Sequence, residues 1–339
     1  MTSKRATDPS AMQEEERAFD LFGSRVRLLA AGPPTPDQSP QLALAEVEAM
    51  LREMHQRLTR FDPASELSAL NADQSDKVEC SEYLLTAVDA ALRAAERSGG
   101  LIDPVMVESL EDAGYAESRA NIASVPLAEA LQAAPERSAA SRRKSAPWRQ
   151  ITVDRRSAEI TRPVGVRIDL GGIGKGLAAD LAASHLDGFA SWCADIGGDL
   201  RLGGTAGMDR EIRISHPLGD SDLHLSLSQG AVATSGVSRR VWLSPDGKQS
   251  FHHLLDPATG LPAWTGVIQA TAVAGSAQEA ETLSKAALLS GPERGGEILS
   301  SCAGGLMILD SGEARVFGPL SDAFQAGADP SPEKVLSER

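Results

Sequence analysis

The sequence is poor in cysteine and in basic residues, and each shortage excludes a class of protein. Its three cysteines, Cys80, Cys193 and Cys302, are far apart and odd in number. Neither a disulfide framework nor a CxxC metal site is therefore indicated. Lys and Arg total 33 against 47 Asp and Glu, a formal charge of −14. A general nucleic-acid binder needs the opposite sign, because Lys and Arg neutralise the phosphates.

Long apolar runs are also missing. No stretch approaches the roughly 18 consecutive apolar residues that a membrane span needs. The first sixteen residues are polar and charged, without the apolar segment of an export signal or a small-residue cleavage site followed by cysteine. We therefore expect a cytoplasmic protein with no membrane span. Because 42% of the 339 residues are hydrophobic, the chain is long and apolar enough to bury a sizeable core.

The order of the patterns favours an α+β architecture. Helices are predicted after Ser39, with Pro40 at the first helical position, and after Ser81, ending at Gly99-Gly100. From residue 151 onward short strands come in pairs and outnumber helices, which argues against repeated βαβ units. The expected strands are 19–31 (entered through Gly23), 151–153, 164–170, 211–214, 223–227, 267–274 and 306–309, and two further helices are expected at 177–186 and 277–289.

One main domain is expected over residues 17–325. Residues 1–16 and 326–339 are polar and are predicted to be flexible ends. Residues 117–147 are rich in Ala, Ser, Arg and Pro, and we interpret them as an exposed insertion around a helical stretch at 127–133.

The densest chemical signal is the segment Asp169-Leu-Gly-Gly-Ile-Gly-Lys-Gly176, where an expected strand runs into four glycines and a helix. Backbone N–H groups at a helix start favour anions, and glycines let a phosphate approach closely. Lys175 adds a positive charge. The segment predicts an anion site.

The loop departs from a P-loop, which needs Ser or Thr after the lysine to hold magnesium, because Gly176 stands there instead. Beside the anion site itself, two alternatives stay open. A Rossmann fingerprint can be written as Gly174-x-Gly176-x-x-Ala179, with Asp195 or Asp199 about twenty residues further on. A mid-chain position and the following paired strands weaken that alternative. The other alternative is a strand-to-helix turn without a ligand.

Three later segments carry polar groups at turns or strand ends. Gly197-Gly198-Asp199 fits either a tight hairpin or close backbone approach to a ring, and Thr234-Ser235-Gly236 places two hydroxyls before a glycine. In His253-Leu-Leu-Asp256-Pro-Ala-Thr259-Gly260, the Asp-Pro-Ala-Thr-Gly part is a turn signature. His253 and Asp256 are also close enough in sequence to suit proton abstraction from an alcohol.

In this order, and together with Arg60-Phe61-Asp-Pro-Ala-Ser-Glu-Leu and Asp103-Pro104, these segments resemble the ApbE family of FAD:protein FMN transferases. The resemblance implies a mixed sheet and helix architecture related to the T-fold, with an FAD cleft. It also implies cleavage of the FAD pyrophosphate, transfer of FMN to a threonine of an acceptor protein, and release of AMP. An FAD store or scaffold without transfer activity, an FAD pyrophosphatase and a nicotinamide enzyme are the alternatives.

The resemblance assigns roles to individual residues. His253, with Asp256 near it, is implied as the base for the incoming threonine. The implied FAD-binding residues are Phe61, Asp103, Gly171, Gly172, Lys175, Gly198, Asp199, Thr234, Ser235, Gly236 and Thr259.

The implied magnesium site departs from the family pattern. The family uses a carbonyl of the glycine loop, here Gly174, with an Asp and a Thr four residues apart on a late helix. This chain has Glu281 and Lys285 at those positions. Glu can still ligate a hard cation, but lysine cannot. Either Glu281 and Lys285 form an ordinary helical ion pair, worth about 0.2–0.5 kcal/mol, or the Lys285 ammonium takes the place of the metal.

Overall fold

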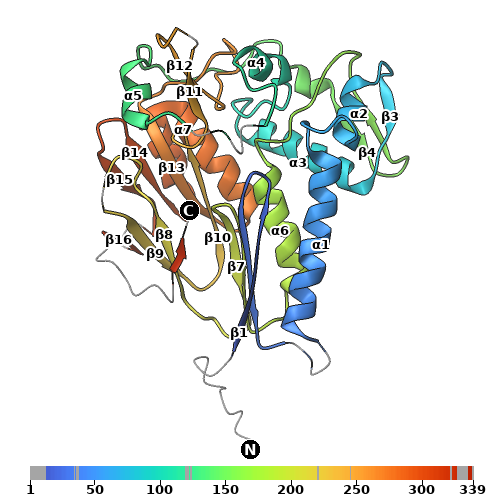
Figure 1. Ribbon diagram of the computed structural model, residues 1–339, viewed down its shortest axis with the longest axis vertical. Coiled ribbons are helices and arrows are strands. Elements are labelled where there is room, and N and C mark those ends of the chain that lie inside the picture. The colour runs from blue at the N-terminus through green and yellow to red at the C-terminus, as the bar shows by residue number, and fades with distance from the viewer. Residues whose placement is uncertain are drawn as a thin grey trace, which may run out of the picture.

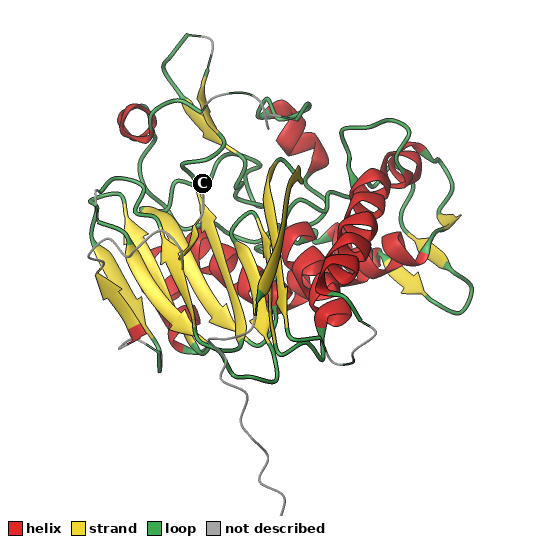
Figure 2. Cartoon of the chain, turned by 60° about the horizontal axis from the view of Figure 1, so that its bottom comes forward, coloured by secondary structure: helices red, strands yellow, loops and turns green. Residues whose placement is uncertain are grey.

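The computed structural model describes residues 13–33, 35, 38–118, 122, 124–219, 221–244, 246–320, 323–326 and 335–337. An eight-stranded antiparallel sheet runs through the molecule in the order β1-β2-β6-β7-β10-β13-β14-β15 (Figures 1 and 2). Its strands are β1 (Glu14–Leu21), β2 (Ser24–Ala31), β6 (Ser191–Ile196), β7 (Asp199–Gly203), β10 (Gly230–Gly236), β13 (Val267–Ala274), β14 (Gly304–Leu309) and β15 (Ala314–Phe317).

Three smaller sheets accompany it. They have the orders β3-β5-β4, β11-β12 and β16-β9-β8-β17. Their strands are β3 (Lys77–Glu79), β4 (Thr152–Asp154), β5 (Glu159–Thr161), β8 (Arg210–Ile214), β9 (Leu223–Leu227), β11 (Val241–Leu243), β12 (Ser250–His252), β16 (Phe324–Ala326) and β17 (Val335–Ser337). The β8–β17 pair is parallel.

Helices cover the large sheet and complete the mixed architecture. They are α1 (Pro40–Leu58), α2 (Glu66–Ala72), α3 (Glu82–Arg97), α4 (Val107–Asp112), α5 (Leu127–Gln132), α6 (Gly174–Leu186) and α7 (Ala277–Ser300). Figure 1 shows α1, α6 and α7 next to one another, and the contacts between these helices agree. One apolar core lies among α1, α3, α6 and strands β2 and β6, and a second lies around β10, β13, β14 and α7. A smaller third cluster includes Met106, Leu110, Tyr115 and Trp242. The expected α+β class is confirmed.

The helix starts follow the capping signals in the sequence. The Ser39 hydroxyl accepts a hydrogen bond from the Leu42 N–H, and the Ser81 hydroxyl accepts one from Leu84. Helix α7 is longer than expected, because it continues to Ser300 across a kink. Gly291 adopts a φ of 77° there, immediately before Pro292, which cannot donate a backbone hydrogen bond.

The strand predicted at 164–170 is wrong: residues 164–165 form a turn, and residues 166–170 belong to none of the described strands. A side chain from α2 takes the hydrogen bonds that a neighbouring strand would make. Asn71 Oδ1 accepts from the Ile168 N–H at 2.7 Å, and Asn71 Nδ2 donates to the Ile168 carbonyl at 2.8 Å. The Asp169 N–H donates to the Pro104 carbonyl at 2.8 Å. Ile168 and Leu170 are therefore buried without belonging to a sheet, whereas Val164 is exposed.

The expected domain boundaries need correction at both ends. Glu14–Glu16 belong to β1 and pair with 29–31 of β2, and Val335–Ser337 form β17 against β8. Residues 1–12, 327–334 and 338–339 lie outside the described residues. The segment 117–147 is not wholly exposed, because Leu127 of α5 is buried in the core. None of the described helices combines the length and the apolar character that crossing a bilayer requires.

We predict that Asn71→Ala lowers the free energy of unfolding by about 1–3 kcal/mol, because it leaves both polar groups of the buried Ile168 backbone unpaired. Urea denaturation would measure the change. The control is Gln74→Ala, which removes an exposed amide bonded only to the Ala72 carbonyl and should change stability by less than about 0.5 kcal/mol. Equal losses in the two variants would contradict the role of Asn71.

Candidate functional site

The glycine loop before α6 is held from several sides. Arg60 Nε forms an ion pair of 2.8 Å with Asp169 Oδ2. Four N–H groups of the loop are already hydrogen-bonded within the chain: Gly171 to Asp169 Oδ1, Ile173 and Gly174 to the Leu170 carbonyl, and Gly176 to Glu281 Oε2. The backbone therefore offers a ligand fewer donors than the sequence suggested.

Helices α6 and α7 approach each other at Gly176. A Cβ at this position would lie 2.6 Å from the Ala277 carbonyl oxygen, so a side chain would force the two helices apart. Asp180 Oδ1 and Oδ2 accept hydrogen bonds from the N–H groups of Ala277 and Gln278 at the start of α7. This close approach brings Glu281, one turn along α7, against the first turn of α6.

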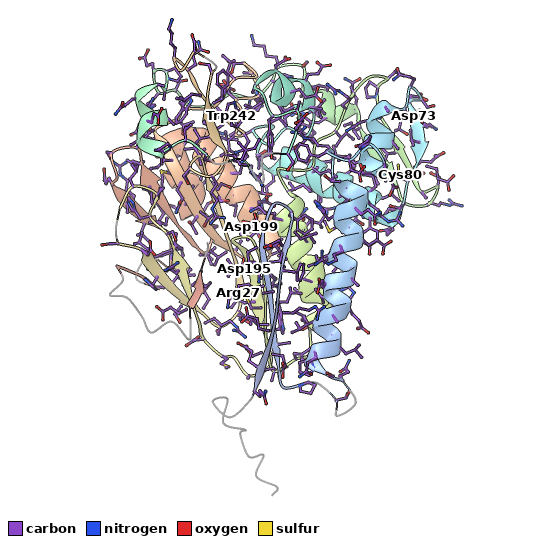
Figure 3. All side chains as sticks on the ribbon, viewed as in Figure 1. Arg27, Asp73, Cys80, Asp195, Asp199 and Trp242 are labelled. Atoms are coloured by element: carbon purple, nitrogen blue, oxygen red, sulfur yellow. The ribbon has the colours of Figure 1, made fainter. Side chains whose placement is uncertain are left out.

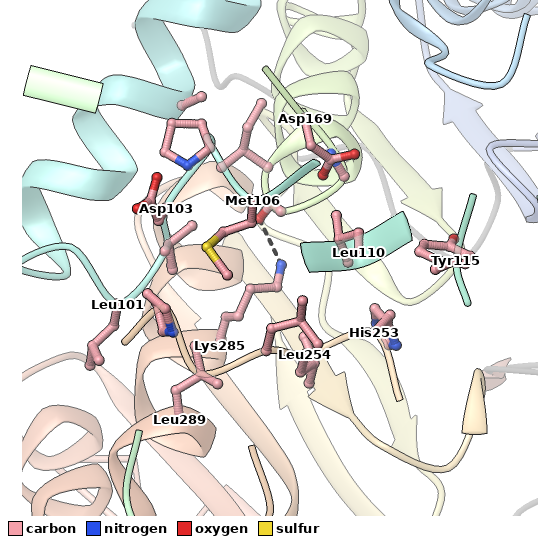
Figure 4. Close-up of a pocket in the computed structure, with 18 of the residues that line it drawn as sticks. Leu101, Asp103, Met106, Leu110, Tyr115, Asp169, His253, Leu254, Lys285 and Leu289 are labelled. Carbon is pink, nitrogen blue, oxygen red and sulfur yellow. Dashed lines mark hydrogen bonds between the residues drawn. The ribbon is translucent and has the colours of Figure 1, made fainter. Parts of the chain in front are cut away.

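Glu281 and Lys285 form a buried polar cluster with the glycine loop. The Gly176 N–H donates to Glu281 Oε2 at 2.9 Å, and Lys285 Nζ contacts Glu281 Oε1 at 3.2 Å. Lys285 Nζ also donates to the Gly172 carbonyl at 2.6 Å, which is the dashed line in Figure 4. Burial raises the pKa of Glu281, while Lys285 favours its ionised form.

Lys175 points instead to the turn between β6 and β7. Its Nζ forms an ion pair of 2.7 Å with Asp199 Oδ2. Burial opposes the charge on Lys175, but Asp199 and Glu281 outweigh it and raise the pKa of the lysine. The turn needs its glycines, because Gly197 and Gly198 have φ values of 62° and 96°.

Asp195 of β6 stabilises the same turn through a hydrogen bond. Its Oδ1 accepts a hydrogen bond of 2.8 Å from the Gly198 N–H, and Arg27 is its partner residue across β2 and β6. Figure 3 shows Arg27, Asp195 and Asp199 following one another along this part of the sheet. Burial raises the pKa of Asp195 to about 6, and Arg27 reduces the shift.

The hydroxyls of β10 face the same region. Thr234 Oγ1 lies 2.9 Å from Thr271 Oγ1, and Ser235 Oγ lies 2.9 Å from Ser284 Oγ of α7. His253 follows β12, and its ring lies 6.4 Å from that of Tyr115. Burial lowers the pKa of His253 well below its usual range, and Arg240 adds to the effect.

Three adjoining cavities meet at Gly171 and Arg240, which line all of them. The cationic cavity, about 380 Å³, is lined by residues that include Lys175, Asp199, Thr234, Ser235, Gly236, Arg239, Arg240, His253, Glu281 and Lys285. The apolar cavity, about 120 Å³, has Ile102, Asp103, Met106, Leu110, Gly172 and Leu254 among its walls (Figure 4). The side cavity, about 540 Å³, includes Met54, Leu58, Phe61, Leu67 and Gly174.

Most of the site residues expected from sequence thus line one continuous cleft, with three exceptions. Gly198 acts through its turn. Asp256 and Thr259 form a turn of their own: Asp256 Oδ1 accepts from the N–H groups of Ser141 and Ala258, and Asp256 Oδ2 accepts from the Thr259 hydroxyl. Among the described residues no hydrogen bond or ion pair joins Asp256 to His253, whose Nδ1 is buried without a partner, so the expected histidine–aspartate pair is not formed.

Comparison with known proteins assigns the family. The ApbE family profile matches residues 22–309. The chain belongs to the ApbE family. It is 28% identical to the FAD:protein FMN transferase of Treponema pallidum over 318 residues, covering 86% of this chain and 83% of the relative. The FAD:protein FMN transferase of Vibrio cholerae is also 28% identical, over 259 residues and 74% of each chain.

Solved structures share the fold. The ApbE protein of Thermotoga maritima superposes with a TM-score of 0.76 at 24% sequence identity, covering 92% of this chain and 99% of that one. The flavin transferase ApbE of Vibrio cholerae gives a TM-score of 0.71 at 20% identity, covering 93% and 100%.

The magnesium ligands implied by the ApbE resemblance do not fit together here. Both oxygens of Glu281 are already bonded, one to an ammonium and one to an amide. Lys285 hydrogen-bonds both Glu281 and a carbonyl of the glycine loop. That carbonyl belongs to Gly172, whereas the expected magnesium ligand was the carbonyl of Gly174. Among the described residues no cluster of three or more His, Cys, Asp or Glu could hold a metal ion.

Two arginines of the cleft received no role from the sequence, although Arg60 belongs to one of the segments that carry the resemblance. Arg60 pairs with Asp169 and lies over the rings of Phe61 and Tyr115, at 4.2 and 4.9 Å from their centroids. Arg240 follows Thr234-Ser235-Gly236 by four residues, and its side chain has no ion pair within the described ranges. The sequence could have indicated a role for Arg240 in the site only through its closeness to that segment.

We predict that Asp195→Asn stabilises the fold more at high pH than at low pH. The folded pKa of about 6 exceeds the ordinary 3.8, so Asp195 contributes full stability below about pH 4 and loses it as pH rises through 6. The asparagine keeps an oxygen for the Gly198 N–H and does not ionise. Its advantage in free energy of unfolding should grow by roughly 1–3 kcal/mol between pH 4 and 7.

Denaturation of both proteins across this pH range measures the effect. The control is Asp187→Asn, which removes the same charge from an exposed residue. If the difference in free energy of unfolding between Asp195→Asn and the wild type does not change with pH, burial of the Asp195 charge does not raise its pKa as we propose.

Proposed function

We propose that this chain is an FAD:protein FMN transferase that moves FMN from FAD to a hydroxyl group of an acceptor protein and releases AMP. The observation that carries the proposal is the cationic cavity. It gathers four positively charged side chains, Lys175, Arg239, Arg240 and Lys285, from three separate segments of a chain whose net charge is −14. The names of the relatives, FAD:protein FMN transferases, support the same activity.

The diphosphate of FAD fits the cationic cavity by charge. Lys175, Arg239, Arg240 and Lys285 line it, against Asp199 and Glu281. Because Lys175 and Lys285 are already paired with these carboxylates, Arg239 and Arg240 have most of their charge left for a ligand, and Arg240 also borders the other two cavities. Its planar guanidinium suits two phosphate oxygens at once.

The two ring systems of FAD require apolar walls on both sides of the diphosphate. The apolar cavity and the side cavity adjoin the cationic cavity at Gly171 and Arg240 and supply them. Phe61, 37% exposed, offers a ring face in the side cavity. In the apolar cavity Asp103 Oδ2 is buried without a partner in the described chain, so it can hydrogen-bond a ring nitrogen or amide.

His253 is the proposed base for the transfer. The oxygen of the acceptor hydroxyl forms a bond to the FMN phosphorus, the bond from that phosphorus to the AMP oxygen breaks, and AMP leaves with the bond's electrons. The hydroxyl proton passes to the neutral His253 imidazole. Burial lowers the pKa of His253 well below its ordinary value, so the imidazole is neutral at neutral pH, and its buried Nδ1 has no hydrogen-bond partner among the described residues.

The acceptor residue and the location stay predictions. A threonine acceptor and a cytoplasmic location come from the sequence analysis alone. Mass spectrometry of the labelled acceptor and fractionation of the source cells would check them.

We predict that His253→Asn lowers the rate of FMN transfer by about 10²–10⁴-fold while FAD still binds, because the base is lost and the cationic cavity is kept. The assay incubates the protein with FAD and an acceptor and measures AMP together with fluorescent, covalently labelled acceptor. The matched control is His185→Asn, in an exposed histidine at the end of α6, which should transfer at the wild-type rate.

The same assay separates the alternatives. AMP released without labelled acceptor would identify an FAD pyrophosphatase. FAD binding with neither product would identify a flavin store. Equal transfer by His253→Asn and wild type would remove His253 from the mechanism.

A further inference from the structure

We propose that Lys285 occupies the position of a divalent cation beside Glu281, so that this chain binds the diphosphate of FAD without a metal ion. The inference rests on the proposed function, because it concerns the same cavity. The supporting observation is that the Lys285 ammonium contacts both Glu281 on α7 and the glycine loop, which is distant from α7 in sequence.

The Lys285 ammonium makes the contacts that a bound cation would make. It joins a carboxylate oxygen of α7, Glu281 Oε1 at 3.2 Å, to a backbone carbonyl of the glycine loop, Gly172 at 2.6 Å. An ammonium has three N–H donors, and these two contacts use two of them. Because Lys285 lines both the cationic and the apolar cavity, the third donor is available to an oxygen of a ligand.

An ordinary helical ion pair would look different. Pairs at i and i+4 on a helix surface are exposed and screened by solvent. Here the side chains of Lys285 and Glu281 are only 11% and 3% exposed. The lysine also bonds a carbonyl 113 residues away in sequence, which a surface pair does not do. The pair is therefore part of the cavity wall.

The same contacts leave no place for a divalent ion. Magnesium needs several oxygen ligands at about 2.0–2.1 Å in near-octahedral geometry. Lys285 already uses Glu281 Oε1 and the Gly172 carbonyl, and the Gly176 N–H uses Glu281 Oε2. A second cation at this point would be repelled by the Lys285 ammonium. Lys175 and Arg240, which line the same cavity, would add to the repulsion.

The experiment measures the dissociation constant of FAD for the full-length protein in excess EDTA and in millimolar magnesium chloride. For the wild type we expect values within about threefold of each other, because the cation is part of the chain. Lys285→Met should weaken FAD binding by about tenfold or more under both conditions. Lys248→Met, in a lysine that is 80% exposed, is the matched control and should bind as the wild type does.

A double variant tests whether the position itself is suited to a cation. Glu281→Asp with Lys285→Thr replaces the ammonium by oxygen donors, so it should bind FAD weakly in EDTA and regain about tenfold or more in magnesium. The wild-type comparison needs no variant and is decisive even if these proteins fold poorly.

The outcomes distinguish this inference from the proposed function. Wild-type FAD binding that requires magnesium overturns the role of Lys285 and leaves the proposed function standing. No FAD binding under either condition overturns the proposed function, and the inference fails with it. Binding that is insensitive to EDTA but unchanged in Lys285→Met also overturns the role of the lysine.

Discussion

The cleft depends on the contact between the first turns of α6 and α7. Gly176 lets the two helices approach so closely that a methyl group would meet the Ala277 carbonyl, and Asp180 ties the start of α7 to α6 through two hydrogen bonds. This contact is the reason why Glu281 reaches the Gly176 N–H. Without it the glycine loop, which has no strand beside it, would lose its connection to α7. This packing constraint therefore fixes the wall of the cationic cavity that Lys175, Glu281 and Lys285 form.

Positive charge in this cleft comes mainly from side chains. A glycine-rich loop before a helix suggests that backbone amides hold the anion, but four of the N–H groups here are hydrogen-bonded inside the protein. Those bonds give the loop a fixed shape, and Lys175, Lys285 and Arg240 provide the charge. Fixed cations in a poorly hydrated site interact with phosphate more strongly than the same cations at the surface. The acidic character of the rest of the chain therefore does not prevent anion binding.

The sequence predicted what is local and missed what is made by distant contacts. The starts of α1 and α3 were predicted correctly because Ser39 and Ser81 cap them from positions next to each helix. The strand at 164–170 was wrong because Asn71, far away in the sequence, satisfies the Ile168 backbone. Asp256 carries a turn signature, and in the structure the turn residues Ala258 and Thr259 donate to its two oxygens. Tertiary contacts therefore decide whether a short motif has a structural or a functional role.

A lysine in place of a divalent ion has different consequences for binding and for transfer. Holding a diphosphate requires a fixed positive charge, which one ammonium supplies through a hydrogen bond. Polarising the phosphorus requires more charge at short range, and a single ammonium gives less of it than a divalent ion. The remaining stabilisation of the transition state must therefore come from other groups in the same cavity. Arg240 is placed for this, since it borders all three cavities and its guanidinium can hydrogen-bond two phosphate oxygens at once.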